Sequence, residues 1–295
     1  MLIIITRSDD ASVNLLEPFI ESQVVRINVD KSDEWAFSYT DGVWQVKDSS
    51  HTHNLGPNTK CWWWKVYFDP EDGDTYRNAE VEYIVREIYA QSSRVGTLVG
   101  NSPSFHQRLG KLAILDIARA HLRAPYTSCV FNTGLSPIGD AVVKSLASSA
   151  FANSRVLYTT RVPLSALDTV GHPWLAQRFI DSPLDVTTYV VGSMIFTYSR
   201  TRTTGKTIDW RKEQLEDLER KAWFPDPLSE RETKSVLSIA QDLGIEWGRF
   251  DFLRDHNGEL WFLEFNANGQ FGFLDELDET GLISAIANYL SKKLG

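Results

Sequence analysis

The sequence predicts an α/β protein that begins with a doubly wound parallel-sheet domain and ends with an antiparallel hairpin carrying polar side chains. Near the N-terminus, a short buried strand from Leu2 to Ile5 is followed by a helical pattern and a second apolar strand. This is a β-α-β unit, which closes with a right-handed crossover. Near the C-terminus, two apolar strands flank Asn257-Gly258, which is a strong signal for a hairpin turn.

Length and composition agree with a globular protein. The 295-residue chain is long enough for two domains or one large α/β domain, and 42% of its residues are hydrophobic. A net charge of −9 argues against a protein that binds nucleic acid by neutralising phosphates. Cys61 and Cys129 are isolated, so they indicate neither a disulfide framework nor a zinc site. The apolar run at the N-terminus is too short for a signal peptide or a membrane span, so we expect a cytoplasmic protein without a membrane partner.

The first half of the chain contains several further local signals. Asp41-Gly42 lies between two alternating runs and predicts a hairpin that decorates the N-terminal domain. Trp62 to Trp64 are consecutive, and because three neighbouring strand residues cannot all face one core, at least one must cover another surface or a partner. A helical stripe spans residues 81–89. A second helix is expected to run to about Leu122 and to stop before Pro125.

We place a domain change near Pro125 and predict three parts, with boundaries 1–124, 125–182 and 183–295. The elements expected beyond the change are strands at 126–131 and 140–146, a small polar flap at 147–154, three apolar runs within 172–200, a loop and surface helix at 201–222, a helix at 229–244 and a final helix at 281–293. The helix at 229–244 has a Ser-x-x-Glu start and a Leu-Gly stop, which are both strong boundary signals.

The C-terminal hairpin carries the chemistry that the sequence indicates best. Glu264 and Asn266 are two residues apart on a strand, so they project from the same face. Asp251 lies opposite Glu264, because the turn at Asn257-Gly258 is midway between them. Two carboxylates and one amide oxygen suit Mg²⁺, which prefers oxygen ligands. A pair of carboxylates for acid/base work is the competing use, but a neutral Asn adds little to proton transfer.

The stretch GRFDFLRDHNGELWFLEFNANGQFG, residues 248–272, resembles the metal-binding hairpin of ATP-grasp enzymes, in which an Asp on one strand faces a Glu-x-Asn on the next. The resemblance implies an ATP-grasp fold: a doubly wound pre-ATP-grasp domain, a small central α+β domain and a C-terminal domain, with ATP between the last two. It also implies site residues. Asp251, Glu264 and Asn266 would hold Mg²⁺, Lys144 and Lys111 would contact phosphates, Gln177, Arg178, Phe179 and Ile180 would line the adenine, and Asp185 would bind the ribose.

Within that superfamily the chain most resembles the graspetide, or microviridin-type, peptide macrocyclases, over nearly its whole length. Asp209-Trp210-Arg211 matches the Asp-Trp-Arg motif of that family, and residues 266–272 match its Asn-x-Asn-Gly-Gln-aromatic-Gly run. These enzymes use ATP to join side-chain carboxylates of a ribosomal precursor peptide to Ser or Thr hydroxyls or Lys amines, through an acylphosphate. The resemblance therefore implies a ligase whose partner is a peptide with leader and core segments; a homodimer is left open.

Three departures from the family pattern concern the substrate contacts more than the nucleotide site. Thr187 stands where the family has an arginine, so Arg211, Arg249 or Arg200 would have to supply the catalytic cation. The stretch between residues 131 and 140 is too short for the helix usually found there. Trp63-Trp64-Lys65 is an altered form of an aromatic-basic segment of the family, and we expect Trp64 or Lys65 to touch the peptide.

Other readings stay open for several residues and for the function. Lys111 fits an exposed helix position as well as a ligand, Asp185 fits a turn, and Asp209 fits a salt bridge beside a core Trp. Two other functions are a ligase that adds amino acids to a protein terminus or joins small molecules, and a catalytically silent binding module. A neighbouring short reading frame rich in Thr or Lys and in Asp or Glu would favour the macrocyclase.

Overall fold

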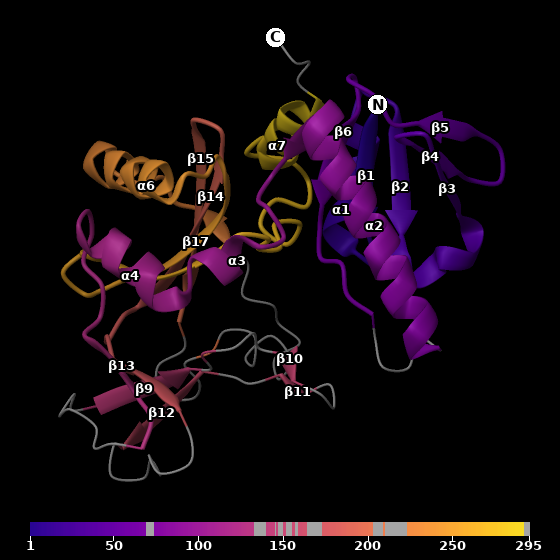
Figure 1. The fold of residues 1–295 in the computed structure, drawn as a ribbon. Coiled ribbons are helices and arrows are strands. Elements are labelled where there is room, and N and C mark those ends of the chain that lie inside the picture. The colour runs from indigo at the N-terminus through magenta and orange to yellow at the C-terminus, as the bar shows by residue number, and fades with distance from the viewer. Residues whose placement is uncertain are drawn as a thin grey trace.

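The computed structural model describes residues 1–68, 74–132, 140–144, 146, 150–151, 155–156, 159–163, 173–202, 209 and 223–291. Figure 1 shows three groups of strands along the chain: an N-terminal group, a small central group, and a C-terminal sheet with its helices. None of the described helices is both long and apolar enough to cross a bilayer.

The N-terminal group is built on a parallel sheet with the strand order β2-β1-β6-β7. Its strands are β1 (Leu2–Thr6), β2 (Val24–Asn28), β6 (Lys60–Trp63) and β7 (Thr97–Val99). Every residue of β1 is buried, as the continuous apolar run of a central parallel strand requires. The helix α1 (Ala11–Leu16) connects β1 to β2, and the Asp10 carboxylate caps it by accepting from the Val13 N–H at 2.9 Å.

A small antiparallel sheet extends this group. It contains β3 (Ala36–Thr40), β4 (Val43–Lys47) and β5 (Thr52–Asn54), and the 3₁₀ segment η2 (Val29–Glu34) leads into it. Asp41 and Gly42 have φ values of 49° and 88°, so both central residues of the turn adopt the left-handed conformation of a type I′ hairpin. The hairpin predicted at this dipeptide is confirmed.

The three consecutive tryptophans are all buried, on two faces of the parallel sheet. Trp63 shares a core with Val85 and Ile88 of the long helix α2 (Thr75–Val95). Trp62 and Trp64 pack on the other face against Trp247, with ring centroids 5.5 Å and 6.3 Å from it. The prediction that they cannot share one core is confirmed. The second face meets the C-terminal sheet, where Trp64 is 0% exposed. The expectation that Trp64 or Lys65 touches the peptide stays a prediction.

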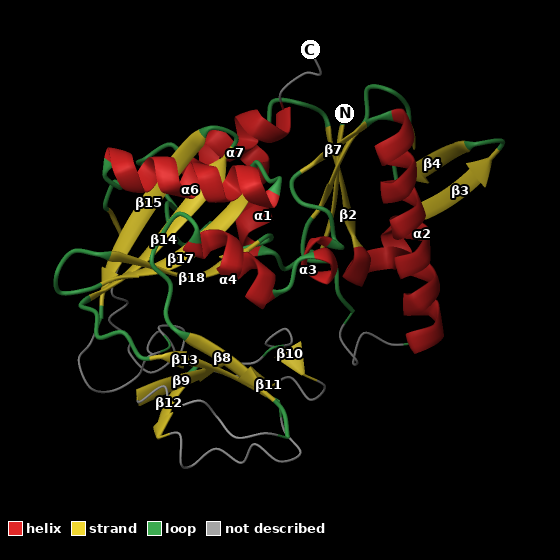
Figure 2. Cartoon of the chain, turned by 60° about the vertical axis from the view of Figure 1, so that its left-hand side comes forward, coloured by secondary structure: helices red, strands yellow, loops and turns green. Residues whose placement is uncertain are grey.

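The single helix predicted to end near Leu122 is in fact two helices, α3 (Phe105–Arg108) and α4 (Lys111–Arg119). Leu109 has an extended backbone, with φ −127° and ψ 98°, and Gly110 caps the second helix. The break turns α4 so that Ile114, Leu115 and Ala118 enter the core of the C-terminal sheet. Figure 2 shows α4 beside α6 on the same face of that sheet.

The central group is an antiparallel sheet with the order β12-β9-β13-β8. Its strands are β8 (Thr127–Val130), β9 (Asp140–Lys144), β12 (Thr160–Pro163) and β13 (Trp174–Arg178), and β10 (Ala150–Phe151) pairs separately with β11 (Arg155–Val156). Strands β8 and β9 match the two predicted strands. Most of the predicted flap at 147–154 and of the predicted helix at 201–222 lies outside the described residues.

The C-terminal sheet has the order β16-β15-β14-β17-β18 and supplies most of the candidate site. Its strands are β14 (Leu184–Val191), β15 (Met194–Thr201), β16 (Phe224–Pro225), β17 (Trp247–Arg254) and β18 (Leu260–Asn266). The helix α6 (Glu230–Leu243) packs on one face, where Val236 and Ile239 meet Val186, Phe250 and Phe252. It is the helix predicted at 229–244, and Gly244 ends it at φ 65°.

The last helix, α7 (Leu282–Ser291), turns back toward the N-terminal group and packs against α1 and the 3₁₀ segment η1 (Glu17–Phe19). Its residues Ile283 and Ile286 share one core with Leu2 and Ile4 of β1. Both α4 and α7 therefore contact sheets outside their own predicted parts. The boundaries at 124 and 182 stay predictions.

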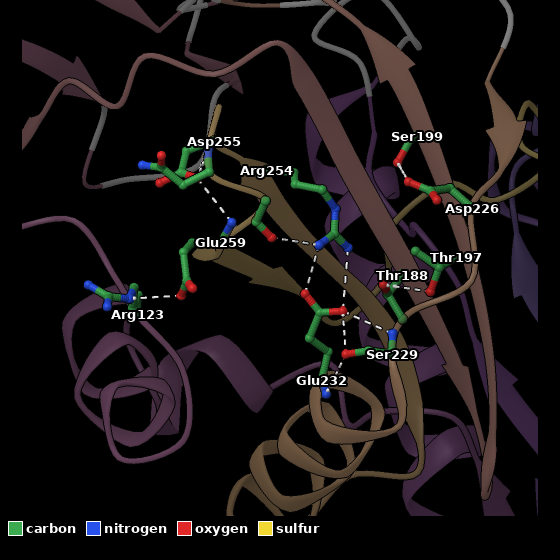
Figure 3. Close-up of polar contacts among 12 residues, drawn as sticks. Arg123, Thr188, Thr197, Ser199, Asp226, Ser229, Glu232, Arg254, Asp255 and Glu259 are labelled. Carbon is green, nitrogen blue, oxygen red and sulfur yellow. Dashed lines mark hydrogen bonds and ion pairs between the residues drawn. The ribbon is translucent and has the colours of Figure 1, made fainter.

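The start of α6 is held to the hairpin β17-β18 by a partly buried ion pair, drawn in Figure 3. The Arg254 guanidinium donates to the Glu232 carboxylate at 2.8 Å, and Glu232 also forms a capping box with Ser229. Burial opposes ionisation of Glu232, but Arg254 and Ser229 outweigh it and lower its pKa below the usual 4.5.

We expect Glu232→Gln to lower the free energy of unfolding by about 1 kcal/mol at pH 7, because the amide keeps the cap and loses the charge. A carboxylate with a lowered folded-state pKa stabilises above its unfolded pKa, so the difference should shrink as the pH falls below 4.5 and should vanish once the pH is below the folded-state pKa of Glu232. Urea unfolding at several pH values measures the difference in free energy of unfolding between the wild type and the variant. Glu230→Gln, in the same helical turn but exposed, is the control and should change stability by less than about 0.5 kcal/mol; equal losses for both variants would contradict the prediction.

Candidate active site

The face of the C-terminal sheet opposite α6 carries two cross-strand rows of polar and aromatic side chains. Side chains alternate along a strand, so the neighbours of Val186, Phe250 and Phe252 point away from α6. Read from β15 to β18, register partners place Tyr198, Thr187, Asp251 and Glu264 in one row and Phe196, Tyr189, Arg249 and Asn266 in the next. Asp251, Glu264 and Asn266 therefore occupy adjacent positions on this face.

A β-bulge sets this register. Phe252 pairs with Phe262, whereas Asp251 pairs with Glu264, so Leu263 is an extra residue in β18. The chain reverses between Asp255 and Glu259, so the turn is centred on Asn257 itself, and the pairs next to it are shifted by one residue from those of a turn centred between Asn257 and Gly258. Without the bulge, Leu263 would stand opposite Asp251.

The Asp251 carboxylate is held by three donors. Thr187 Oγ1 donates to Oδ1 at 2.7 Å, and Asn266 Nδ2 donates to Oδ2 at 2.7 Å. The Arg249 guanidinium donates to Oδ2 at 3.1 Å. Thr187, noted above as a departure from the family pattern, therefore orients Asp251, and Arg249 places a cation beside it.

Glu264 is the point at which the predicted cations converge. Burial raises its pKa, but the charges of Lys144, Lys111 and Arg249 and a hydrogen bond from Asn266 outweigh burial, so its pKa lies below the usual value. Lys144 comes from the central sheet, Lys111 from the first turn of α4, and Arg249 from β17. The exposed-helix reading of Lys111 is disfavoured, since its charge acts on Glu264 and on His106.

An open pocket between the central and C-terminal sheets brings most of the predicted residues together. Its described lining includes Lys144, Gln177, Arg178, Phe179, Ile180, Asp185, Arg249, Asp251, Glu264 and Asn266, together with Arg202, Asp209 and Trp223. Asp209 is 5% exposed and accepts the Thr159 N–H at 2.9 Å. Arg200 and Lys111, which the structure does describe, are not part of this lining, and Arg211 lies outside the described residues.

The segment from Gln177 to Ile180 forms one wall. Gln177 is 2% exposed, and its side-chain amide donates to Thr127 Oγ1 at 3.1 Å. The N–H groups of Arg178 and Phe179 already donate to the carbonyls of Tyr126 and Asp140, at 2.8 Å and 2.9 Å. A base bound along this wall would therefore use other groups of the segment.

Asp185 is the second residue of β14, so the turn reading is wrong. Its carboxylate faces two arginines, with 3.8 Å to Arg200 Nη1 and 3.5 Å to Arg202 Nη1. Arg200 is 2% exposed, so this cation lies below the surface of the pocket, and its catalytic role stays a prediction. The sequence reading missed Arg202; strand alternation two residues after Arg200 was the signal that could have found it.

The two glycines after β18 allow this segment to approach both neighbours closely. A Cβ on Gly269 would lie 2.7 Å from Arg249 Cβ, and one on Gly272 would lie 3.2 Å from Ser12 Oγ. Between them, the Gln270 carbonyl accepts from Arg249 Nη1 at 3.1 Å, and the Gln270 side chain donates to Asp10 Oδ2 at 3.3 Å. Phe271 is fully buried against Trp64, with ring centroids 5.6 Å apart. This segment therefore joins the site to the N-terminal sheet.

The donor set fits Mg²⁺ by its chemistry. Asp251, Glu264 and Asn266 supply two carboxylates and an amide on one rigid sheet, next to a pocket, which is the oxygen-rich environment that Mg²⁺ prefers. No cluster of three or more His, Cys, Asp or Glu with metal-binding geometry occurs among the described residues. The lysines and Arg249 around Glu264 suit the negative charge of phosphates.

Comparisons with known proteins identify the fold. No protein-family model and no curated protein sequence matches the chain. Solved structures do match over almost its whole length. One match is a RiPP-associated ATP-grasp ligase from Chryseobacterium gregarium, solved in complex with ADP and a leader and core peptide. It superposes with a TM-score of 0.82 at 21% sequence identity, and the alignment covers 98% of this chain and 96% of the ligase.

Two further solved structures agree. Macrocyclase MdnC from Microcystis aeruginosa MRC, bound with precursor peptide MdnA, has a TM-score of 0.78 at 20% identity, with 99% of this chain and 100% of its own covered. ATP-grasp ligase PsnB, complexed with a minimal precursor, Mg and ADP, has a TM-score of 0.71 at 15% identity, with 98% and 96% covered. The chain therefore has the ATP-grasp fold, as the sequence predicts.

Proposed function

We propose that the protein is an ATP-dependent carboxylate ligase that crosslinks side chains of a ribosomal precursor peptide. The observation that carries this proposal is the convergence of Lys144, Lys111 and Arg249 on Glu264, in the row shared with Asp251. Such an arrangement of oxygen donors and cations is suited to a metal-bound polyphosphate. The whole-length similarity to ligases solved with precursor peptides supports a peptide as the substrate.

The residues of the pocket divide into three roles under this proposal. Asp251, Glu264 and Asn266 would hold Mg²⁺, which when bound neutralises phosphate charge. Lys144 and Lys111 would bind phosphate oxygens as point charges, and the wall from Gln177 to Ile180 with Asp185 would hold the nucleoside. The catalytic work of this chain is then mainly positioning and charge neutralisation.

The reaction would proceed in two balanced steps. An oxygen of the substrate carboxylate attacks the γ-phosphorus of ATP, forming an acylphosphate and releasing ADP. A hydroxyl or amine of the same peptide then attacks the acyl carbon, forms the ester or amide, loses its proton and expels phosphate. Arg249 is the cation best placed to act where Thr187 cannot, since it lies beside Asp251 and lines the pocket, whereas Arg200 does not.

Mass spectrometry of the product tests this function. Acidic precursor peptides encoded near the gene would be incubated with enzyme, ATP and Mg²⁺, and a loss of one water per linkage is expected. An added amino acid instead of lost water would support the terminal ligase. Binding of ATP or of such a peptide without any ATP turnover would support the silent module.

A further inference from the structure

Lys65 has a backbone conformation that its side chain does not favour. Its φ is +49°, in the left-handed region. The other described non-glycine residues with positive φ are Asp41, Asn132 and Asp278, whose short polar side chains tolerate this conformation. Lysine has no such local compensation, so the conformation is a strained one of the kind that occurs at functional sites.

The position of Lys65 in the fold is that of a ligand-contacting residue. It follows β6, at the carboxyl end of the parallel sheet with the order β2-β1-β6-β7. After β1 the chain adds β2 on one side of β1, and it then adds β6 and β7 on the other side. The direction in which strands are added therefore switches between β1 and β6. Ligands of open parallel sheets bind outside the carboxyl ends of the strands at such a switch point.

The surroundings of Lys65 leave its amine without an ionic partner. Nζ lies 5.8 Å from the centre of the Trp64 ring, and the amine forms no hydrogen bond or ion pair with the described residues. The charged groups that face it are Asp10 and Arg249. Asp10 is already engaged: it accepts from Val13 N at 2.9 Å, Trp64 Nε1 at 3.1 Å and Gln270 Nε2 at 3.3 Å.

Charge and burial together define what would bind there. Burial lowers the pKa of Lys65 to about 8, Asp10 opposes this and Arg249 adds to it, so the amine is still mostly protonated at pH 7. A largely buried cation without an ionic partner is stabilised by an incoming anion. Arg249 contacts Asp251, so an anion between Lys65 and Arg249 would lie next to the candidate metal site, on the side of the N-terminal sheet.

We propose that Lys65 binds the side-chain carboxylate that is to be activated, and that this subsite lies between the N-terminal sheet and Arg249. The inference rests on the proposed ligase function and deepens it by naming a residue for the acceptor carboxylate. The phosphates would lie on the other side, where Lys144 and Lys111 act on Glu264. Lys65 acts here as a cation, not as a base.

Nuclear magnetic resonance of lysine-labelled protein tests the subsite without turnover. The probes are N-acetylglutamate amide, its neutral glutamine analogue, and a non-hydrolysable ATP analogue with Mg²⁺. We expect the glutamate probe, but not the glutamine probe, to raise the pKa of the Lys65 amine. Binding of the glutamate probe should weaken as the pH rises through about 8. No response of Lys65 to the glutamate probe, or a response to the nucleotide alone, would overturn the proposal.

Three variants separate charge from folding. Lys65→Gly suits the left-handed backbone and should fold at least as well, yet weaken the glutamate probe at least about tenfold. Lys65→Arg should still bind the glutamate probe. Because a guanidinium stays charged, binding by this variant should be lost only at a higher pH than in the wild type. Lys31→Ala, at an exposed lysine, is the control. Undiminished binding by Lys65→Gly contradicts the subsite, whereas failure of nucleotide and Mg²⁺ to bind the wild type contradicts the ligase function itself.

Discussion

Replacing Glu264 by glutamine is expected to abolish ligation while the protein still folds cooperatively. The amide keeps the shape of the side chain but removes the charge on which Lys144, Lys111 and Arg249 converge. A neutral amide is a weaker ligand for a divalent cation, and the cations would be left without their carboxylate. We expect product formation to fall by at least about a thousandfold, measured as crosslinked peptide by mass spectrometry.

Glu259→Gln is the matched control, because Glu259 lies on the same hairpin but is half exposed and pairs with Arg123 at 3.1 Å. It should leave product formation unchanged. Circular dichroism and thermal unfolding would show that both variants fold. ATP- and Mg²⁺-dependent product from Glu264→Gln at the wild-type rate would remove Glu264 from the metal site.

The second large effect is expected for Lys144→Ala. Lys144 ends β9 in the central sheet, lines the pocket and acts on Glu264 from the opposite side. Loss of a charged hydrogen-bond donor to a phosphate should raise the dissociation constant for ATP about ten- to a hundredfold. Calorimetry with a non-hydrolysable ATP analogue and Mg²⁺ measures this constant directly.

Lys234→Ala is the control for this measurement, since Lys234 is 75% exposed and pairs with Glu230 on the surface of α6. The dissociation constant of the Lys234→Ala variant for the ATP analogue should equal that of the wild type. An unchanged constant for Lys144→Ala would exclude Lys144 from the nucleotide site and would leave Lys111 as the phosphate contact to test.

Much of the hairpin could be predicted because its determinants are local. Strand alternation places Glu264 and Asn266 on one face, and a turn dipeptide fixes the approximate centre of the hairpin. The predicted pairing of Asp251 with Glu264 is confirmed, but for a reason the sequence did not show. The turn is centred on Asn257 rather than between Asn257 and Gly258, which shifts the register by one residue. The bulge at Leu263 shifts the register back by one and so restores the pairing.

Other features depend on contacts between segments far apart in the chain, and these could not be predicted. The break at Leu109-Gly110 directs α4 onto a sheet whose strands come more than sixty residues later. The Asp10 carboxylate joins Trp64 and Gln270, which local patterns cannot relate. The role of Thr187 is of the same kind: only the register of β14 with β17 shows that its hydroxyl orients Asp251.

That these side chains bind a metal and a nucleotide is a prediction, and the position of a bound metal tests it most directly. Crystals grown with Mn²⁺ and ADP would show the metal by anomalous scattering. We predict one peak bound by oxygens of Asp251, Glu264 and Asn266, at about 2.0–2.2 Å as for comparable ions. A nucleotide bound in the pocket with its metal held elsewhere, or with no metal near these three side chains, would contradict the account.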